Sequence, residues 1–289
     1  MKSRFADLDG PVHIADFGGA GAPVLLLHGL GASHTSWMPV GAALAGRGRV
    51  IAPDLIGFGR TPLAGRAPSI EANVALLGRL LDAETRGPVT VVGNSMGGLV
   101  AVMLAAARPD RVARLVLVAP ALPRPPGAPI DRTVAALFTI NLLPVIGERA
   151  MRRRLAEVGP ERVLRDTLRL CGVDPARMMP EAWEASVALA HERARWPWTI
   201  DAYLGAARSL VRTTIRRERV YDAIRRLRAP ALLTQGTRDR LVPAVVSEAA
   251  ARLRSDWKVE RMEGVGHVPQ VEVPERWLDL VTRWLPESA

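Results

Sequence analysis

The chain contains almost no cysteine. Cys171 is the single one among 289 residues, so neither an intrachain disulfide nor a cysteine-based metal cluster can form. A chain of this kind suits a reducing compartment, and a cytoplasmic location is the default expectation.

Long apolar runs are also absent. No segment approaches the roughly 18–20 consecutive apolar residues that cross a bilayer. The first ten residues carry four charged side chains and no apolar stretch, so we expect no secretory signal there. With 48% hydrophobic residues the chain is too apolar for disorder. We expect a soluble globular protein, either one large domain or a domain with an insertion.

Lysine is nearly missing too, because 37 of the 39 basic residues are arginine. The net charge of +10 would suit an anionic partner, but an arginine bias is equally typical of a GC-rich genome. The excess is local, since residues 121–228 hold 20 arginines and 12 acidic residues. The clusters Arg152–Arg154 and Arg216–Arg217 are typical of a solvated face, and the alternative is a weak contact with anionic substrates or an anionic membrane surface. No nucleic-acid-binding motif accompanies the charge, so we expect no nucleic-acid partner.

What the chain has in abundance is an alternation of short apolar runs and helix-length segments. Runs that are apolar throughout are typical of strands buried on both faces of a parallel sheet. Their regular alternation with helices predicts an α/β doubly wound sheet. The predicted strands are Val24–Leu27, Arg49–Ala52, Val89–Val92, Leu115–Val118 and Ala231–Leu233, and the predicted helices are Ile70–Glu84, Leu99–Ala107, Ala244–Leu253 and Pro274–Leu285.

The alternation stops after residue 118. Five prolines fall between Pro120 and Pro129, which indicates a linker. From Thr133 to Arg226 the pattern is helical, with no strand-like run. We therefore predict an α/β core in two parts, residues 1–122 and 229–289, with an all-helical cap inserted at 123–228.

The sharpest chemical signal is the segment Gly93-Asn94-Ser95-Met96-Gly97-Gly98, between a predicted strand and a predicted helix. It fits G-x-S-x-G in the context that gives this motif its meaning. A tight strand-to-helix turn leaves no room for side chains two residues to either side of the serine, and glycines occupy both positions. We predict Ser95 as the nucleophile.

A serine nucleophile needs a general base, and five histidines compete for that role. His13 lies in an alternating segment and is expected on a strand surface, whereas His191 lies in a charged helical stretch. His28 and His34 flank a glycine turn and are candidates to line a pocket. His267 lies in a glycine-rich loop between the last predicted strand and the final helix, where the carboxyl edge of the sheet should be. We predict His267 as the base.

The acid that orients the base should follow an intervening strand. Asp239 does so after Ala231–Leu233, although Arg238 and Arg240 also suit it to a surface ion pair. The position after Leu115–Val118 offers no carboxylate, and Asp54 precedes the serine and is better explained as bracing a loop. The order Ser95, Asp239, His267 is the order of the α/β-hydrolase triad.

An oxyanion also needs fixed hydrogen-bond donors. The residue after the nucleophile supplies one, the backbone N–H of Met96. The loop His28-Gly29-Leu30-Gly31 follows the strand Val24–Leu27, and we predict the N–H of Leu30 as the second donor.

With these motifs the sequence resembles the α/β-hydrolase fold enzymes, specifically the serine-nucleophile, esterase- or lipase-like members with a helical cap. The resemblance covers nearly the whole chain outside the cap and includes the segments Asp54–Thr61 and Gly266-His267. It implies a mostly parallel eight-stranded sheet flanked by helices, a cap after the sixth strand, and no cofactor. None of the predicted site residues forms a metal-binding set.

Several activities occur with this machinery. Dehalogenases and epoxide hydrolases carry an aspartate nucleophile, which Ser95 excludes. The string Gly93–Gly98 resembles the meta-cleavage-product hydrolases, which cut C–C bonds, but these usually have Pro-Gly-Ala where this chain has Leu30-Gly31-Ala32 and a Trp where it has Val268. Cofactor-free perhydrolases or haloperoxidases are a further alternative. Hydrolysis of a carboxylic ester is the expectation that these motifs favour.

The cap carries the prediction about substrate. An apolar roof over the nucleophile would favour a hydrophobic acyl group or an aromatic small molecule, and packing of cap helices on the core is the competing interpretation. A non-catalytic small-molecule receptor is the alternative from another class, and the sequence leaves the oligomeric state open. The residues predicted to contact substrate are Gly29, His34, Asn94, Phe138, Leu142, Trp198 and Val268.

Overall fold

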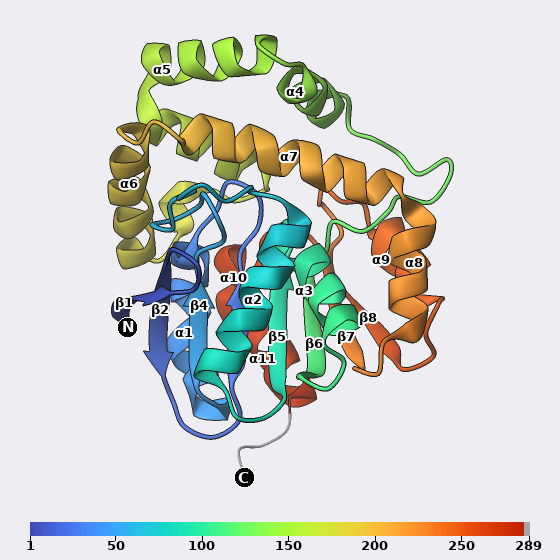
Figure 1. Cartoon of the computed structure of the whole chain (residues 1–289). Helices are drawn as coiled ribbons and strands as arrows, with labels where there is room; N and C mark the ends of the chain where they lie inside the picture. Colours follow the sequence, from blue (N-terminus) through green and yellow to red (C-terminus); the bar gives the residue numbers. More distant parts are fainter. Residues whose placement is uncertain (286–289) are drawn as a thin grey trace.

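The computed structural model describes residues 1–285 as an α/β core beneath a layer of helices (Figure 1). Within these residues the core contains one eight-stranded sheet, with the strand order β1-β2-β4-β3-β5-β6-β7-β8. Strand β2 runs antiparallel to both of its neighbours, and the strands from β4 to β8 pair in parallel. The predicted fold class is therefore confirmed. The strands are β1 (Lys2–Asp7), β2 (Pro11–Gly18), β3 (Val24–Leu27), β4 (Val50–Pro53), β5 (Val89–Asn94), β6 (Val112–Val118), β7 (Ala231–Gly236) and β8 (Trp257–Met262).

The strands alternate their side chains between two helical layers. In β3, Leu25 and Leu27 belong to one apolar cluster, and Val24 and Leu26 belong to the other. This period of two is why a fully apolar run suits a strand that is buried on both faces. The first layer consists of α2 (Ile70–Glu84), α3 (Met96–Ala107), α8 (Arg217–Arg226) and α9 (Ala244–Ala251), and the second contains α1 (Met38–Leu44) and α11 (Pro274–Trp284), with α10 (Pro269–Glu272) beside α11.

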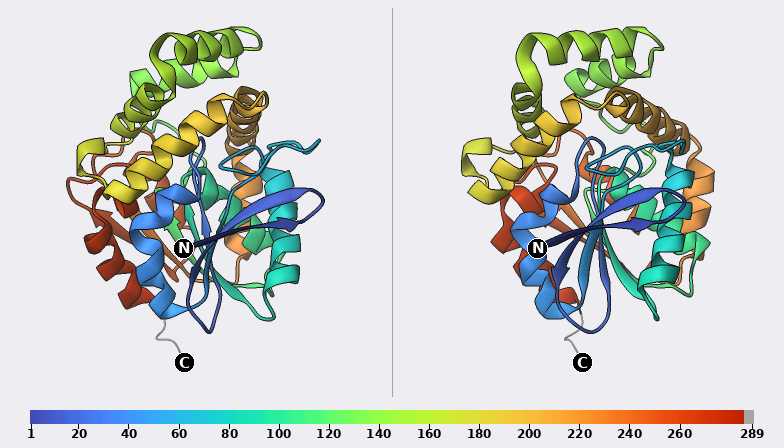
Figure 2. Two further views of the ribbon diagram at one scale, coloured as in Figure 1. Left: turned by 90° about the vertical axis from the view of Figure 1, so that its left-hand side faces the viewer. Right: turned by 60° about the vertical axis from the view of Figure 1, so that its left-hand side comes forward.

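The remaining helices lie between β6 and β7 in the chain and cover one end of the sheet (Figures 1 and 2). They contact the loop that follows β3, so they cover the carboxyl ends of the parallel strands. We call this group the cap. It comprises α4 (Arg132–Leu142), α5 (Ile146–Leu170), α6 (Pro180–Ala194) and α7 (Thr199–Ile215). Within residues 1–285 the short 3-10 turns are η1 (His34–Trp37), η2 (Ala45–Arg47) and η3 (Pro175–Arg177).

Local sequence explains where cap helices begin and break. The side chain of Asp131 accepts hydrogen bonds from the backbone N–H groups of Thr133 and Val134 and so caps the start of α4. Helix α5 contains a non-helical residue, Gly159, followed by Pro160, and the two together divide it into two straight pieces.

Two features differ from the sequence expectations. Helix α8 falls within the segment predicted as cap, but Val220 and Ile224 pack in the core cluster and α8 contacts α3. The prediction that His13 lies on a strand surface is wrong, because its side chain is fully buried. The reason is that β2 is an interior strand, and His13 points from it toward the carboxylate that follows β4.

No single helix among residues 1–285 is long and apolar enough to cross a membrane. Helices α4 and α5 meet that criterion only as a pair, and they are bent by 111° with respect to each other.

Helix α3 lies very close to the backbone at the end of β3. A Cβ atom on Gly97 would lie 2.6 Å from the carbonyl oxygen of His28 and would also overlap the carbonyl of Leu27. Both obstacles are backbone atoms, which cannot move aside as a flexible side chain can. Glycine at position 97 is therefore required by the packing of α3 on the sheet.

Replacing this glycine should destabilise the core. We expect Gly97→Ala to lower the free energy of unfolding by about 2 kcal/mol or more, because overpacking forces the helix away from the strand. Gly87→Ala is the matched control, since its Cβ would meet open space. Urea unfolding of both variants measures the difference, and equal stability of the two would contradict this view of the helix–sheet contact.

Candidate active site

Ser95 lies at the turn from β5 into α3, with a backbone geometry that few residues adopt. Its φ of 53° and ψ of −115° lie outside the helix and strand regions, which is the strained geometry of a nucleophile elbow. The backbone is held there by the Ser95 N–H, which donates to the carbonyl of Val118 at 2.9 Å, and by the Ser95 carbonyl, which accepts from Ala121 at 2.9 Å. The turn lifts the Ser95 side chain off the sheet at the N-terminus of α3.

The glycines of the motif make this turn possible. A Cβ atom on Gly93 would lie 2.6 Å from the carbonyl carbon of Gly97, and a Cβ on Gly97 would meet the carbonyl of His28. Neither position therefore accommodates a side chain. On the other side of the serine, a Cβ on Gly29 would lie 3.2 Å from the Cβ of Ser95. The loop after β3 therefore lies directly against the nucleophile, and Gly29 keeps that approach open.

His267 and Asp239 form a buried pair on neighbouring loops. The imidazole Nδ1 donates to Asp239 Oδ2 at 2.7 Å, so the lone pair of Nε2 remains available to accept a proton. Asp239 also accepts from the backbone N–H groups of Leu241 and Val242 and from the side chain of Gln235. Four donors thus fix the carboxylate, and the flanking arginines point elsewhere: Arg240 pairs with Asp131 and Arg238 donates to the carbonyl of Gly264.

The residue before the nucleophile links it to the histidine. The side-chain amide of Asn94 donates to the carbonyl of His267 at 3.2 Å and to the carbonyl of Val118 at 3.0 Å. Asn94, the residue before Ser95, therefore ties the backbone of His267 to the turn that carries Ser95. The Ser95 hydroxyl forms no hydrogen bond within residues 1–285, and its pairing with His267 stays a prediction, as such bonds are often long before substrate binds.

Two backbone N–H groups next to Ser95 are free to bind an anion. Met96 is the first residue of α3, where helical amides have no partner within the helix, and Leu30 lies in the loop that contacts Ser95. Neither N–H donates to another group in the part of the chain that the structure describes. This pair of unused donors has the properties of an oxyanion hole.

The cap places residues over this site that the sequence did not single out. The ring of Tyr203, on α7, lies 3.3 Å from where a Cβ on Gly31 would be, directly above the loop that carries Leu30. The side-chain amide of Asn141, on α4, lies 3.4 Å from the Tyr203 hydroxyl and donates to it. Burial raises the pKa of Tyr203 to about 12, so this hydroxyl keeps its proton. Neither residue belongs to a motif, and only the folded cap brings them to the site.

A second cap segment contacts the histidine loop. The N–H of His267 donates to the carbonyl of Cys171 at 2.7 Å, and Gly172 packs against Gly266 so closely that a Cβ on Gly172 would lie 3.0 Å from the Gly266 Cα. Burial raises the pKa of the Cys171 thiol to about 12, so the thiol is not a competing nucleophile at neutral pH. The cap thus forms part of the support of the catalytic loop.

A third cap contact reaches the loop that carries Leu30. Arg193, at the end of α6, donates to the carbonyl of Gly31 at 3.2 Å, and its guanidinium lies 5.6 Å from the centre of the Phe58 ring. Its neighbour Glu192 accepts two hydrogen bonds from Arg60, at 2.8 and 3.0 Å. The end of α6 is therefore fastened to the core beside the unused donor of Leu30.

His28 has a structural role. Its Nδ1 donates to the carbonyl of Gly29 at 2.8 Å, and its Nε2 accepts from the N–H of Leu55 at 3.0 Å. Only a neutral ring can make both bonds. Burial lowers the pKa of His28 to about 4, which agrees with the neutral form, and the ring joins the loops after β3 and β4.

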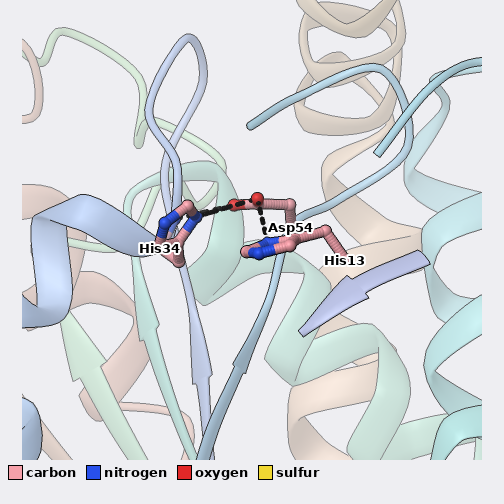
Figure 3. A group of neighbouring side chains, drawn as sticks. All are labelled: His13, His34 and Asp54. Carbon is pink, nitrogen blue, oxygen red and sulfur yellow. Dashed lines mark hydrogen bonds and ion pairs between the residues drawn. The ribbon is translucent and has the colours of Figure 1, made fainter. Parts of the chain in front are cut away.

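His34, His13 and Asp54 form a second buried cluster (Figure 3). Nδ1 of His13 and Nδ1 of His34 donate to Asp54 Oδ2 at 2.7 and 2.9 Å, and the carboxylate also accepts from the backbone N–H groups of His34 and Arg60. Burial alone would raise the pKa of Asp54, but the hydrogen bonds from the two imidazoles outweigh it and lower that pKa. These are ligand types that zinc accepts, but here Nδ1 of each imidazole already donates to the carboxylate, so the cluster is explained as a brace between loops. The expectation that Asp54 braces a loop is confirmed.

The other residues predicted to contact substrate have the following places. Phe138 and Leu142 are half-buried on α4, and Trp198 is half-buried and stacks on Trp196 with the ring centres 5.4 Å apart. Val268 packs with Val173, Met178 and Val271, between the histidine loop and the cap. His34 donates two hydrogen bonds to Asp54, and this structural role explains its presence. Contact of these residues with substrate stays a prediction.

Comparison with known proteins finds relatives that match most of the chain. Residues 24–280 match the alpha/beta hydrolase family. The pimeloyl-[acyl-carrier protein] methyl ester esterase of Aromatoleum aromaticum is 31% identical over 259 residues, which cover 87% of this chain and 93% of that protein. The 2-hydroxymuconate semialdehyde hydrolase of a Pseudomonas strain is 30% identical over 276 residues, covering 93% and 89%. A solved structure of a thermophilic esterase from Thermogutta terrifontis is 25% identical, with a TM-score of 0.70 and coverage of 99% and 98%.

The buried neutral His28 generates a prediction about stability and pH. Because its folded pKa of about 4 lies below the ordinary 6.5, the unfolded chain binds the proton more readily. The contribution of His28 to the free energy of unfolding is therefore complete above pH 6.5 and is lost as the pH falls toward 4. The total loss amounts to roughly 3 kcal/mol.

The measurement is urea unfolding at several pH values between about 4.5 and 7.5. His28→Asn keeps a donor to Gly29 but has no proton to gain, so it should be less stable at neutral pH and show a shallower loss toward acid. The exposed His191, changed to Asn, is the control and should keep the wild-type slope. An unchanged slope in His28→Asn would contradict the assignment of a neutral ring.

Proposed function

The chain belongs to the alpha/beta hydrolase family, and from that premise we propose that it is a serine hydrolase that cleaves a carboxylic ester of a hydrophobic acyl or aromatic small molecule. The observation that carries the proposal is the nucleophile elbow: Ser95 at a strained turn, adjoining a buried histidine–carboxylate pair and two unused backbone donors. This combination is the machinery of acyl transfer. It has no other evident use in the fold.

The proposed reaction has two steps. In the first, His267 Nε2 takes the proton of Ser95 while the serine oxygen attacks the ester carbonyl, and the charged imidazole then protonates the departing alcohol. In the second, His267 takes a proton from water while the water oxygen attacks the acyl-enzyme, and the charged imidazole then returns a proton to the Ser95 oxygen as the acid is released. Asp239 keeps the proton of Nδ1 in place throughout and stabilises the imidazolium, which its 2.7 Å hydrogen bond to that nitrogen supports.

The tetrahedral intermediates carry a negative charge on the former carbonyl oxygen. The N–H groups of Leu30 and Met96 would bind it, helped by the N-terminus of α3. These donors need no reorganisation, because neither is engaged elsewhere in residues 1–285. Each is expected to lower the barrier by about 3 kcal/mol.

Support for the substrate class comes from the surroundings of the nucleophile. Val268 and Met178 belong to an apolar cluster between the histidine loop and the cap, and the ring of Tyr203 lies over the oxyanion loop. Such walls favour an apolar group over a sugar or a peptide. The similarity to a methyl ester esterase, at 31% identity over most of both chains, favours an ester as the scissile group.

Hydrolysis of a C–C bond is the second candidate. The similarity to a 2-hydroxymuconate semialdehyde hydrolase favours it, as does the segment Gly93–Gly98. Against it stand Leu30 and Val268, where the meta-cleavage-product hydrolases usually have proline and tryptophan. A dienoate substrate tests this alternative beside the esters.

The activity test uses p-nitrophenyl esters with acyl chains from about two to twelve carbons, a range chosen to span small and large apolar pockets. We expect turnover in the wild type and a loss of about four to six orders of magnitude in kcat for Ser95→Ala and for His267→Ala. The exposed Ser255→Ala and His191→Ala serve as matched controls. Wild-type rates in either triad variant would refute the assignment, and turnover of the dienoate alone would favour C–C hydrolysis.

The contact of Arg193 with the oxyanion loop generates a further prediction. Arg193→Met keeps an apolar stem near Phe58 but removes the donor to the Gly31 carbonyl, which should loosen the position of the Leu30 N–H. We expect kcat to fall by about threefold to tenfold, the value of one hydrogen bond, with KM nearly unchanged. The exposed neighbour Arg195→Met is the control, and equal kcat values for the two variants would show that the cap does not position the oxyanion loop.

A further inference from the structure

Large apolar side chains are exposed in one region of the cap. Seven of them fall between residues 130 and 158, each with 38–55% of its surface accessible. A group of this kind in a folded protein usually marks an interaction surface, whereas scattered apolar residues do not. The seven are Ile130, Leu137, Ile140, Leu143, Val145, Ile146 and Val158.

Five of these residues surround the corner between α4 and α5, and we call them the apolar crest: Leu137, Ile140, Leu143, Val145 and Ile146. On α4, Ile140 lies on the exposed face, and Leu137 lies at the edge between this face and the buried one, which includes Val134 and Asn141. In Figures 1 and 2 these two helices form the outermost layer of the molecule, with α7 between them and the sheet. The crest therefore faces away from the protein.

The backbone at the corner between α4 and α5 is a second indication that the crest contacts another molecule. Val145 has a φ of 64° and a ψ of −49°, a strained combination outside the helix and strand regions that is costly for a β-branched residue. Its side chain is 55% exposed, so packing does not offset the strain. Stability alone would favour a different residue, and an apolar side chain at this position needs a reason outside the fold.

Charge identifies the kind of partner. Between residues 130 and 170 all five acidic side chains form ion pairs with arginines: Asp131, Glu148, Glu157, Glu161 and Asp166. Three exposed arginines in the same stretch, Arg132, Arg149 and Arg169, have no ion-pair partner among residues 1–285. Apolar side chains beside unpaired arginines suit a surface that is both apolar and negatively charged.

We propose that the apolar crest and its arginines bind the surface of an anionic lipid membrane or micelle. The apolar residues would enter the headgroup region, and Arg132 and Arg149 would contact lipid phosphates, as in helices that lie in the plane of a membrane surface. A second copy of this chain fits the crest less well, because both copies would bring the same excess of positive charge to the contact. The inference does not depend on the proposed hydrolysis.

Docking in this orientation has a consequence for the site. Helix α4 exposes Leu137 and Ile140 of the crest, and its buried Asn141 donates to Tyr203 above the oxyanion loop. A lipid surface held by the crest would therefore lie against the roof of the site. An amphiphilic ester that leaves this surface would then have to pass α4 and α7 to reach Ser95.

The test is sedimentation of Ser95→Ala protein with vesicles, so that lipid hydrolysis cannot alter the result. Vesicles of equal parts phosphatidylglycerol and phosphatidylcholine are compared with pure phosphatidylcholine. We expect binding that is at least about tenfold stronger to the anionic vesicles and that weakens with added salt, because each arginine near such a surface contributes a several-fold gain.

Two variants test the two parts of the crest. Ile140→Asn with Val145→Asn should weaken binding to the anionic vesicles by about tenfold or more, and both side chains are exposed, so the fold is kept. Arg132→Glu with Arg149→Glu should weaken it similarly. The controls are Ile215→Asn, an apolar residue of the cap that is 71% exposed, and the exposed Arg86→Glu; both should bind as the parent does.

Three outcomes would overturn the proposal. The first is that the parent protein fails to bind anionic vesicles, and the second is that the crest variants bind as well as their controls. The third is that light scattering shows a dimer that Ile140→Asn with Val145→Asn dissociates, because the crest would then be an interface between two copies of the chain. Vesicle binding without ester hydrolysis would leave the inference intact and count against the proposed function instead.

Discussion

The site depends on one backbone constraint, the left-handed turn at Ser95. Side chains at Gly93 and Gly97 would clash with the backbone around that turn, and Gly29, in the loop after β3, lies directly against Ser95. The same closeness leaves the N–H groups of Leu30 and Met96 without other partners. A single packing arrangement of β3, β5 and α3 thus places Ser95 beside two backbone N–H groups that have no other partner in the part of the chain that the structure describes.

The cap supports the loops of the candidate site as well as covering them. It contacts three of these loops: the carbonyl of Cys171 accepts from His267, Arg193 donates to Gly31, and Asp131 pairs with Arg240 beside Asp239. A change in cap position would alter each of these contacts at once. The geometry of the site therefore depends on the position of the cap. A surface that binds the outer face of the cap could alter that geometry.

Much of the core could be predicted from sequence because its signals are local. The fully apolar run Val24–Leu27 marks a strand with the bounds that the structure has, and the glycines around Ser95 mark the elbow. Tyr203, Arg193 and the carbonyl of Cys171 could not be found in this way, since their relevance arises from packing between segments far apart in the chain. The prediction of a surface position for His13 fails for the same reason. Alternation in β2 indicates a strand, but only the sheet order shows that β2 is interior.

The central claim is that Ser95 is a nucleophile activated by the buried pair of His267 and Asp239. Its most direct measurement is covalent labelling with an alkyl fluorophosphonate, followed by intact-protein and peptide mass spectrometry. The account predicts a single adduct, located on Ser95, and no adduct in folded His267→Ala protein. A folded wild-type protein that stays unlabelled, or that carries the adduct on another residue, would contradict it.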